Sequence, residues 1–259
     1  MDRVTRYFPL AVGLLLGYLA VHPPAWLAAL GWLRFPAMAA VVLLLLVAFV
    51  VLVVAANLPA EVQMRPAADP CPPELEALAR EYRALGFTPA GPLREVGAAP
   101  PALVLAFTNE ARRTYGTAFR TGTVPSRVAF DFFSFLEGRE GGLSSCAARG
   151  AGTLPAGPGA FSQILPGASV AVLFEAHRRA VEHLEGLGLR FRPVSAATFD
   201  ADFRAGLAQQ RRAFLAAPLR NAAIAVWRSA TRTTPHLGAI EVQRAARRKI
   251  RALRSGLSA

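Results

Sequence analysis

The stretch on which the predicted fold depends reads PAMAAVVLLLLVAFVVLVVAAN and runs from Pro36 to Asn57. It contains no charged residue, and at 1.5 Å per residue it makes about 33 Å of helix, the thickness of a bilayer's hydrocarbon core. A buried strand would be shorter, and a core helix of this length in a water-soluble protein would show a polar stripe. The stretch therefore predicts a transmembrane helix.

A second apolar run, YFPLAVGLLLGYLAV, covers Tyr7 to Val21 and is followed by His22 and two prolines. Paired prolines end a helix, so this run spans either residues 7–22 or, with a kink, residues 7–33. A cleaved signal peptide is the alternative, because Arg3 and Arg6 make a basic start, but no good cleavage site follows. We expect a two-span transmembrane hairpin over residues 1–58.

The charges beside the two spans predict their orientation. Arg3, Arg6 and Arg65 flank the outer ends of the pair, whereas Arg34 lies in the connection. Basic residues favour the inner side, so both termini are expected inside. The expected location is the inner membrane, with the large C-terminal domain in the cytoplasm.

Gly13 and Gly17 lie four residues apart in the first run. Small residues at this spacing let helix backbones approach closely, so self-association through these glycines is a further expectation.

After a Pro-rich linker at residues 59–73, residues 74–259 are expected to form one α+β domain. Strand-like segments come first, joined by short connections, and helical patterns come afterwards, which predicts an antiparallel β-meander followed by C-terminal helices. The expected strands are 103–107, 113–121, 126–136 and 143–148, and the expected helices are 74–85, 169–187, 196–217 and 237–253.

No catalytic motif stands out. His177 and His183 flank Glu182 on one expected helix, but six residues place their side chains about 120° apart, which does not suit a metal pair. Asp131 lies among phenylalanines, and Ser144, Ser145 and Cys146 are nucleophile types without an assignable base. Cys71 and Cys146 belong to no C-x-x-C pair. The glycine-rich stretch 150–159 lacks the Lys-Ser/Thr of a phosphate loop. We expect no metal and no cofactor, and the catalytic residues stay unknown.

The charge balance indicates an anionic partner. The chain carries 29 basic against 17 acidic residues, for a net charge of +12, although the near-exclusive use of arginine also fits a GC-rich coding bias. The clearest signal is the helix predicted at residues 239–254, which is apolar on one side and basic on the other. The residues expected to bind lipid or another anion are Arg244, Arg247, Arg248, Lys249, Arg251 and Arg254. The alternative is the solvated outer face of a packed helix.

These observations favour a membrane-anchored, non-catalytic binding or scaffolding protein whose basic helix contacts anionic lipid headgroups. An enzyme acting near the membrane on an apolar or lipid-like substrate is the first alternative. Binding of nucleic acid through the Arg-rich helices ranks last, because the aromatic residues fall in strand segments and are expected to be buried.

Overall fold

A computed structural model describes the chain in nine ranges, which hold all the secondary structure discussed below. These are residues 22, 33–57, 63–68, 70–97, 102–120, 128–147, 157, 159–231 and 239–255. The expected first span, Gly13 and Gly17 lie outside these residues, as does most of the glycine-rich stretch 150–159.

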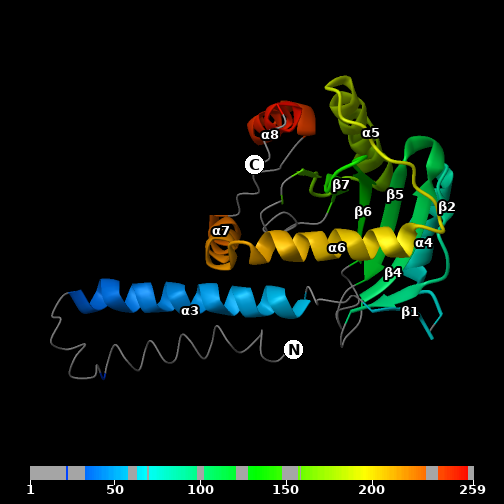
Figure 1. Cartoon of the computed structure of the whole chain (residues 1–259). Helices are drawn as coiled ribbons and strands as arrows, with labels where there is room; N and C mark the ends of the chain where they lie inside the picture. Colours follow the sequence, from blue (N-terminus) through cyan, green and yellow to red (C-terminus); the bar gives the residue numbers. More distant parts are fainter. Residues whose placement is uncertain are drawn as a thin grey trace.

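One mixed sheet is the centre of the fold (Figure 1). Its path is β1-β3-β4-β5-β6-β7-β8, and β2 pairs with β4 beside this path. The strands are β1 (Met64–Pro66), β2 (Thr88–Pro89), β3 (Arg94–Val96), β4 (Ala102–Asn109), β5 (Thr114–Arg120), β6 (Val128–Phe135), β7 (Gly142–Cys146) and β8 (Ala160–Ile164). Strands β4 to β7 are antiparallel neighbours in chain order, but β8 pairs parallel with β7. The expected four-stranded meander is therefore wrong as a description of the whole sheet, because a parallel pairing needs a long crossover that local patterns do not reveal.

Two helices cover one face of the sheet, α4 (Pro73–Ala84) and α5 (Val170–Gly186). Tyr82 of α4 is fully buried, and its ring stacks on that of Phe107 with the centroids 4.5 Å apart. A Cβ at Gly116 of β5 would lie 2.2 Å from this ring, so the close approach of α4 requires a glycine there. The Ser169 side chain caps α5 by accepting a hydrogen bond from the Val172 amide.

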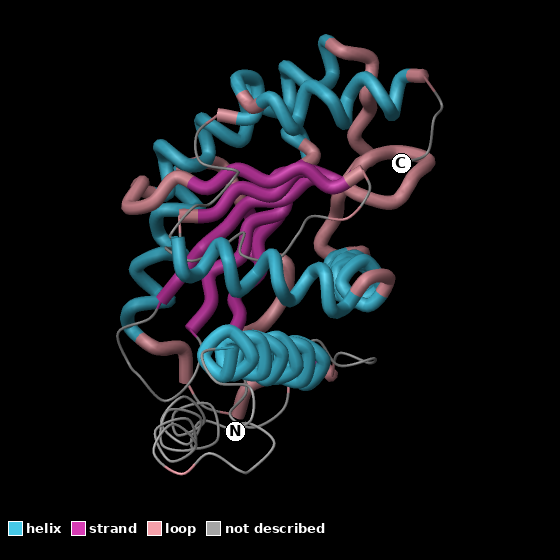
Figure 2. The backbone as a smooth tube through the Cα atoms, turned by 90° about the vertical axis from the view of Figure 1, so that its left-hand side faces the viewer, coloured by secondary structure: helices cyan, strands magenta, loops and turns pink. Residues whose placement is uncertain are grey.

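The opposite face of the sheet is covered in part by α6 (Phe199–Leu215) (Figure 2). Phe199 packs edge-on against Tyr115 of β5, and the Tyr115 hydroxyl donates a 2.6 Å hydrogen bond to Asp202. Asp202 also pairs with Arg192 at 2.8 Å. Burial, together with the bond to Asp202, raises the pKa of Tyr115 to about 12.

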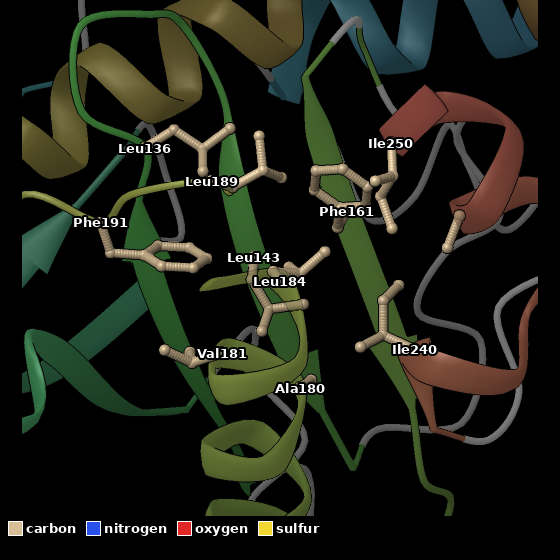
Figure 3. Close-up of a cluster of buried hydrophobic side chains, with 11 residues drawn as sticks. Leu136, Leu143, Phe161, Ala180, Val181, Leu184, Leu189, Phe191, Ile240 and Ile250 are labelled. Carbon is tan, nitrogen blue, oxygen red and sulfur yellow. The ribbon is translucent and has the colours of Figure 1, made fainter. Parts of the chain in front are cut away.

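The β8 side of the sheet carries the C-terminal elements, the short 3-10 helix η3 (Ile240–Val242) and α8 (Arg244–Arg254). Figure 3 shows how Ile240 and Ile250 join Phe161 of β8 and Leu184 of α5 in one apolar cluster. This cluster fixes α8 to the body of the protein.

The remaining helices, α3 (Arg34–Asn57) and α7 (Pro218–Thr231), lie side by side. Val47 of α3 is only 6% exposed because it packs against Phe214 and Ala222. No helix in the described part of the chain is long and apolar enough to cross a membrane. The expected span at residues 36–57, and with it the two-span hairpin, is therefore wrong, whereas the expected first span lies outside the described residues. Part of the apolar surface of α3 is used instead in packing against α6 and α7.

Candidate functional site

The α8 helix forms from strong helix formers, but its charges do not serve its own stability. Its sequence RAARRKIRALR has no acidic residue in the first turn, and no side chain caps its N-terminus. Arg251 and Arg254 at the C-terminal end favour the helix dipole, whereas Arg244 and Arg247 at the N-terminal end oppose it. Helix formation alone would not select this distribution of arginine.

The apolar side of α8 faces the core. Ala246 and Ile250 are each 4% exposed, and Leu253 packs against the same cluster. Since this side is mostly buried, α8 has no broad apolar face left to insert into a bilayer. A flat surface that binds α8 must therefore contact its charged side.

Lys249 differs from the other predicted anion-binding residues. Its Nζ donates to the carbonyl oxygens of Gly157 and Ala160, both at 2.5 Å, and lies 5.5 Å from the centre of the Phe161 ring. Partial burial lowers the pKa of Lys249 to about 8. Lys249 therefore ties α8 to the start of β8 rather than extending from the surface.

The five other predicted residues form what we call the arginine face: Arg244, Arg247, Arg248, Arg251 and Arg254, all exposed. Over the ranges that the structure describes, none of the five is paired with a carboxylate. Elsewhere the arginines most firmly held in the fold do have acidic partners, such as Arg94 with Asp200 and Arg192 with Asp202. The arginine face is thus a strip of charge that the described chain leaves unneutralised.

The residues considered for catalysis do not meet. Asp131 of β6 lies opposite Cys146 of β7 and accepts a hydrogen bond from Thr117. Burial raises the pKa of Asp131 to about 6. Its place in the strand alternation puts it on the face that carries Phe133, whereas His177 lies under the other face.

His177 is the centre of a buried hydrogen-bond network that the sequence did not suggest. It is 0% exposed, with Nδ1 at 2.8 Å from the Ser145 hydroxyl and Nε2 at 3.0 Å from the Ser134 hydroxyl. A serine and a histidine at this distance can form a nucleophile and base, but here all three side chains are buried and the ring has no carboxylate partner among the described residues. Burial lowers the pKa of His177 to about 3, so it is neutral. The signal in the sequence was its position, since His177 falls on the apolar stripe of Leu173, Ala180 and Leu184.

Metal chemistry has no support in the described ranges, where no three His, Cys, Asp or Glu side chains lie close enough to hold an ion. His183 and Glu182 lie near the end of α5, and Glu182 pairs with Arg178. Neither Cys71 nor Cys146 is in a disulfide.

The comparisons with known proteins add no constraint on these residues. No protein-family model, no curated protein and no solved structure matches the chain.

Proposed function

We propose that this chain is a non-catalytic binding protein whose arginine face binds the phosphate headgroups of an anionic lipid surface. The observation that carries the proposal is the set of five exposed arginines on α8 without acidic partners in the described chain. Guanidinium groups match phosphate in shape and bind it through paired hydrogen bonds. Each cation near an anionic surface contributes on the order of 1 kcal/mol, so five act strongly together.

The contact is peripheral, because the apolar side of α8 packs into the protein. The buried Ala246 and Ile250 leave mainly charge for a flat lipid surface, so binding to that surface should be largely electrostatic. The cytoplasmic side of an inner membrane is a surface of this kind. The catalytic alternative receives less support, since Asp131 and His177 lie on opposite faces of the sheet. Nucleic-acid binding also receives less, because Tyr82, Tyr115 and Phe132 are buried instead of stacking beside α8.

The test is sedimentation of the full chain with vesicles of phosphatidylcholine, with and without phosphatidylglycerol. We expect glutamine at all five positions of the arginine face to weaken binding to the anionic vesicles at least about tenfold. The matched control removes the same charge from five other exposed arginines, Arg80, Arg83, Arg112, Arg139 and Arg190. It should weaken binding less than about threefold, because only the position of the charge differs.

The salt dependence of vesicle binding is an independent test. Binding of the unmodified chain to anionic vesicles should fall steeply when the ionic strength is raised from about 0.05 to 0.3 M. An equal loss in the two glutamine variants would contradict the proposal, as would tighter binding to a DNA duplex than to the vesicles under the same conditions.

A further inference from the structure

An open groove of about 510 Å³ runs beside the arginine face. It lies between α8 and Leu187, the residue at which α5 ends. The groove is lined by Leu187, Arg247, Ile250, Arg251, Arg254 and Ser255. Its size falls in the range of sites that hold small molecules.

The lining divides into an apolar floor and a basic rim. Ile250 belongs to the apolar cluster shown in Figure 3 and keeps only 4% of its surface exposed, while the half-buried Leu187 packs against this cluster and supplies most of the floor. The rim is Arg247, Arg251 and Arg254, at helix positions i, i+4 and i+7, which bring the three side chains to one side of α8 over about 10 Å. Arg244 and Arg248 belong to the arginine face but do not line the groove.

The combination restricts the ligand. A free inorganic anion would use the rim and leave the floor in water, whereas a neutral apolar molecule would use the floor and leave the rim without a partner. A molecule that joins an anionic head to a single alkyl chain satisfies both surfaces. Each methylene buried on the floor should raise the affinity about three- to fourfold.

We propose that this groove is a binding site for one single-chain anionic amphiphile of the alkyl phosphate class, with the phosphate on the arginine rim and the first part of the chain over Leu187 and Ile250. The inference rests on the proposed function, because it names the place where one lipid-like molecule is held individually. It goes beyond that function in requiring the groove as well as the charge.

The experiment is calorimetric titration of the full chain with ethyl phosphate, decyl phosphate and inorganic phosphate, with decyl phosphate kept below its critical micelle concentration. We expect decyl phosphate to bind at least about tenfold more tightly than ethyl phosphate, because only the longer chain covers the floor, and inorganic phosphate to bind weakest. Affinity that does not change with chain length would overturn the proposal, since the apolar floor would then have no part in binding.

Paired variants locate the site. Arg251→Gln with Arg254→Gln should lower the affinity for decyl phosphate at least about tenfold, while Arg244→Gln with Arg248→Gln, equal in charge, should stay within about twofold. Ser255→Trp should also abolish the dependence on chain length, because Ser255 is exposed and a large side chain there fills the groove without disturbing the core. An equal loss of affinity in the two pairs of glutamine variants would show that the groove is not the binding site.

The two proposals fail in different ways. If the anionic vesicles bind the chain and decyl phosphate does not, the groove is overturned and the lipid-surface function stands. If decyl phosphate binds with the expected dependence on chain length and rim variants, while the vesicles do not bind, the groove stands as a small-molecule site and the lipid-surface function is overturned.

Discussion

In the hydrogen-bond network around His177, donors and acceptors can be assigned one after another from Gln163 to Thr114. The amide oxygen of Gln163 accepts from the Ile240 backbone N–H, so its NH₂ group donates to Ser145. Ser145 then donates to His177 Nδ1, and His177 Nε2–H donates to Ser134. Beyond Ser134 the chain of bonds reaches Thr114, whose hydroxyl donates to the Arg112 carbonyl. The network therefore requires the neutral ring with its proton on Nε2.

This requirement predicts a loss of stability in acid. Burial lowers the pKa of His177 in the folded protein to about 3, whereas the unfolded chain has the ordinary value of about 6.5. Below about pH 6.5 the histidine of the unfolded chain is protonated while His177 in the folded protein stays neutral, so the free energy of unfolding falls from about pH 6.5 down to about pH 3. Between pH 7 and pH 4.5 this one group should lower the free energy of unfolding by roughly 2 to 3 kcal/mol. Urea unfolding at the two pH values measures this difference.

The control is His177→Gln, which cannot titrate. This variant should be less stable than the unmodified protein at pH 7, because a shorter side chain cannot reach both serines. Its free energy of unfolding should nevertheless fall less on acidification than that of the unmodified protein, by the amount given above. Asp131 acts in the opposite sense, since burial raises its pKa to about 6 and its protonation on acidification favours the folded state. Asp131 is present in both proteins and cancels in the comparison. Equal pH dependence in the two proteins would contradict this, because it would mean that His177 has the same pKa in the folded protein as in the unfolded chain.

At the scale of elements, the Asp202 carboxylate helps to hold α6 on the sheet. Asp202 is 10% exposed and joins Arg192 and the Tyr115 hydroxyl. Asp202→Ala would leave Arg192 without its carboxylate and the Tyr115 hydroxyl with only its bonds to Ser195 and Thr198, at a cost of about 2 to 3 kcal/mol. Hydrogen exchange should then rise in α6 before it rises in β5. Glu140→Ala is the control, because its ion pair with Arg212 is exposed on both sides and should contribute less than about 0.5 kcal/mol. Equal destabilisation by the two variants would contradict this assignment.

Elements with a local pattern could be predicted from the sequence, and contacts between distant segments could not. The strand around Tyr115 alternates, the strand around Phe132 is dense in Val and Phe, and α5 has a clear apolar stripe, so all three lie close to where they are expected. Strand β8 lies between the last expected strand and the helix expected from residue 169, where no strand was expected, and its parallel partner is set by tertiary packing. In the candidate site, the basic and apolar sides of α8 follow from its helical period. The inward position of Lys249 does not, since its carbonyl partners are 92 and 89 residues away.

At the scale of the whole molecule, the apolar packing falls into separate clusters. Three of them lie along the sheet, whereas the fourth consists of Val47, Phe214 and Ala222, with Val51 packed against it. Helix α3 contacts α7 extensively, and α6 links this pair to the sheet. On the α3 and α7 surfaces, Leu44 is 62% exposed and Trp227 is 68% exposed. Among the described side chains, the buried cluster of this helical unit is smaller than each cluster on the sheet, and the stability of the unit should be correspondingly lower.

We therefore expect α3 and α7 to open before the sheet does. Val47→Ala removes two methyl groups from the small cluster and should lower the local opening free energy by about 1 to 2 kcal/mol, measured by hydrogen exchange of α3 and α7 amides. The amides of β5 should be unchanged, because they are held by clusters that Val47 does not touch. Leu44→Ala, at an exposed position of the same helix, should have little effect on either region. If Val47→Ala lowered hydrogen-exchange protection equally in α7 and β5, the helices and the sheet would unfold as one cooperative unit. The link through α6 would then be stronger than the packing of Phe199 and Phe214 at its two ends indicates.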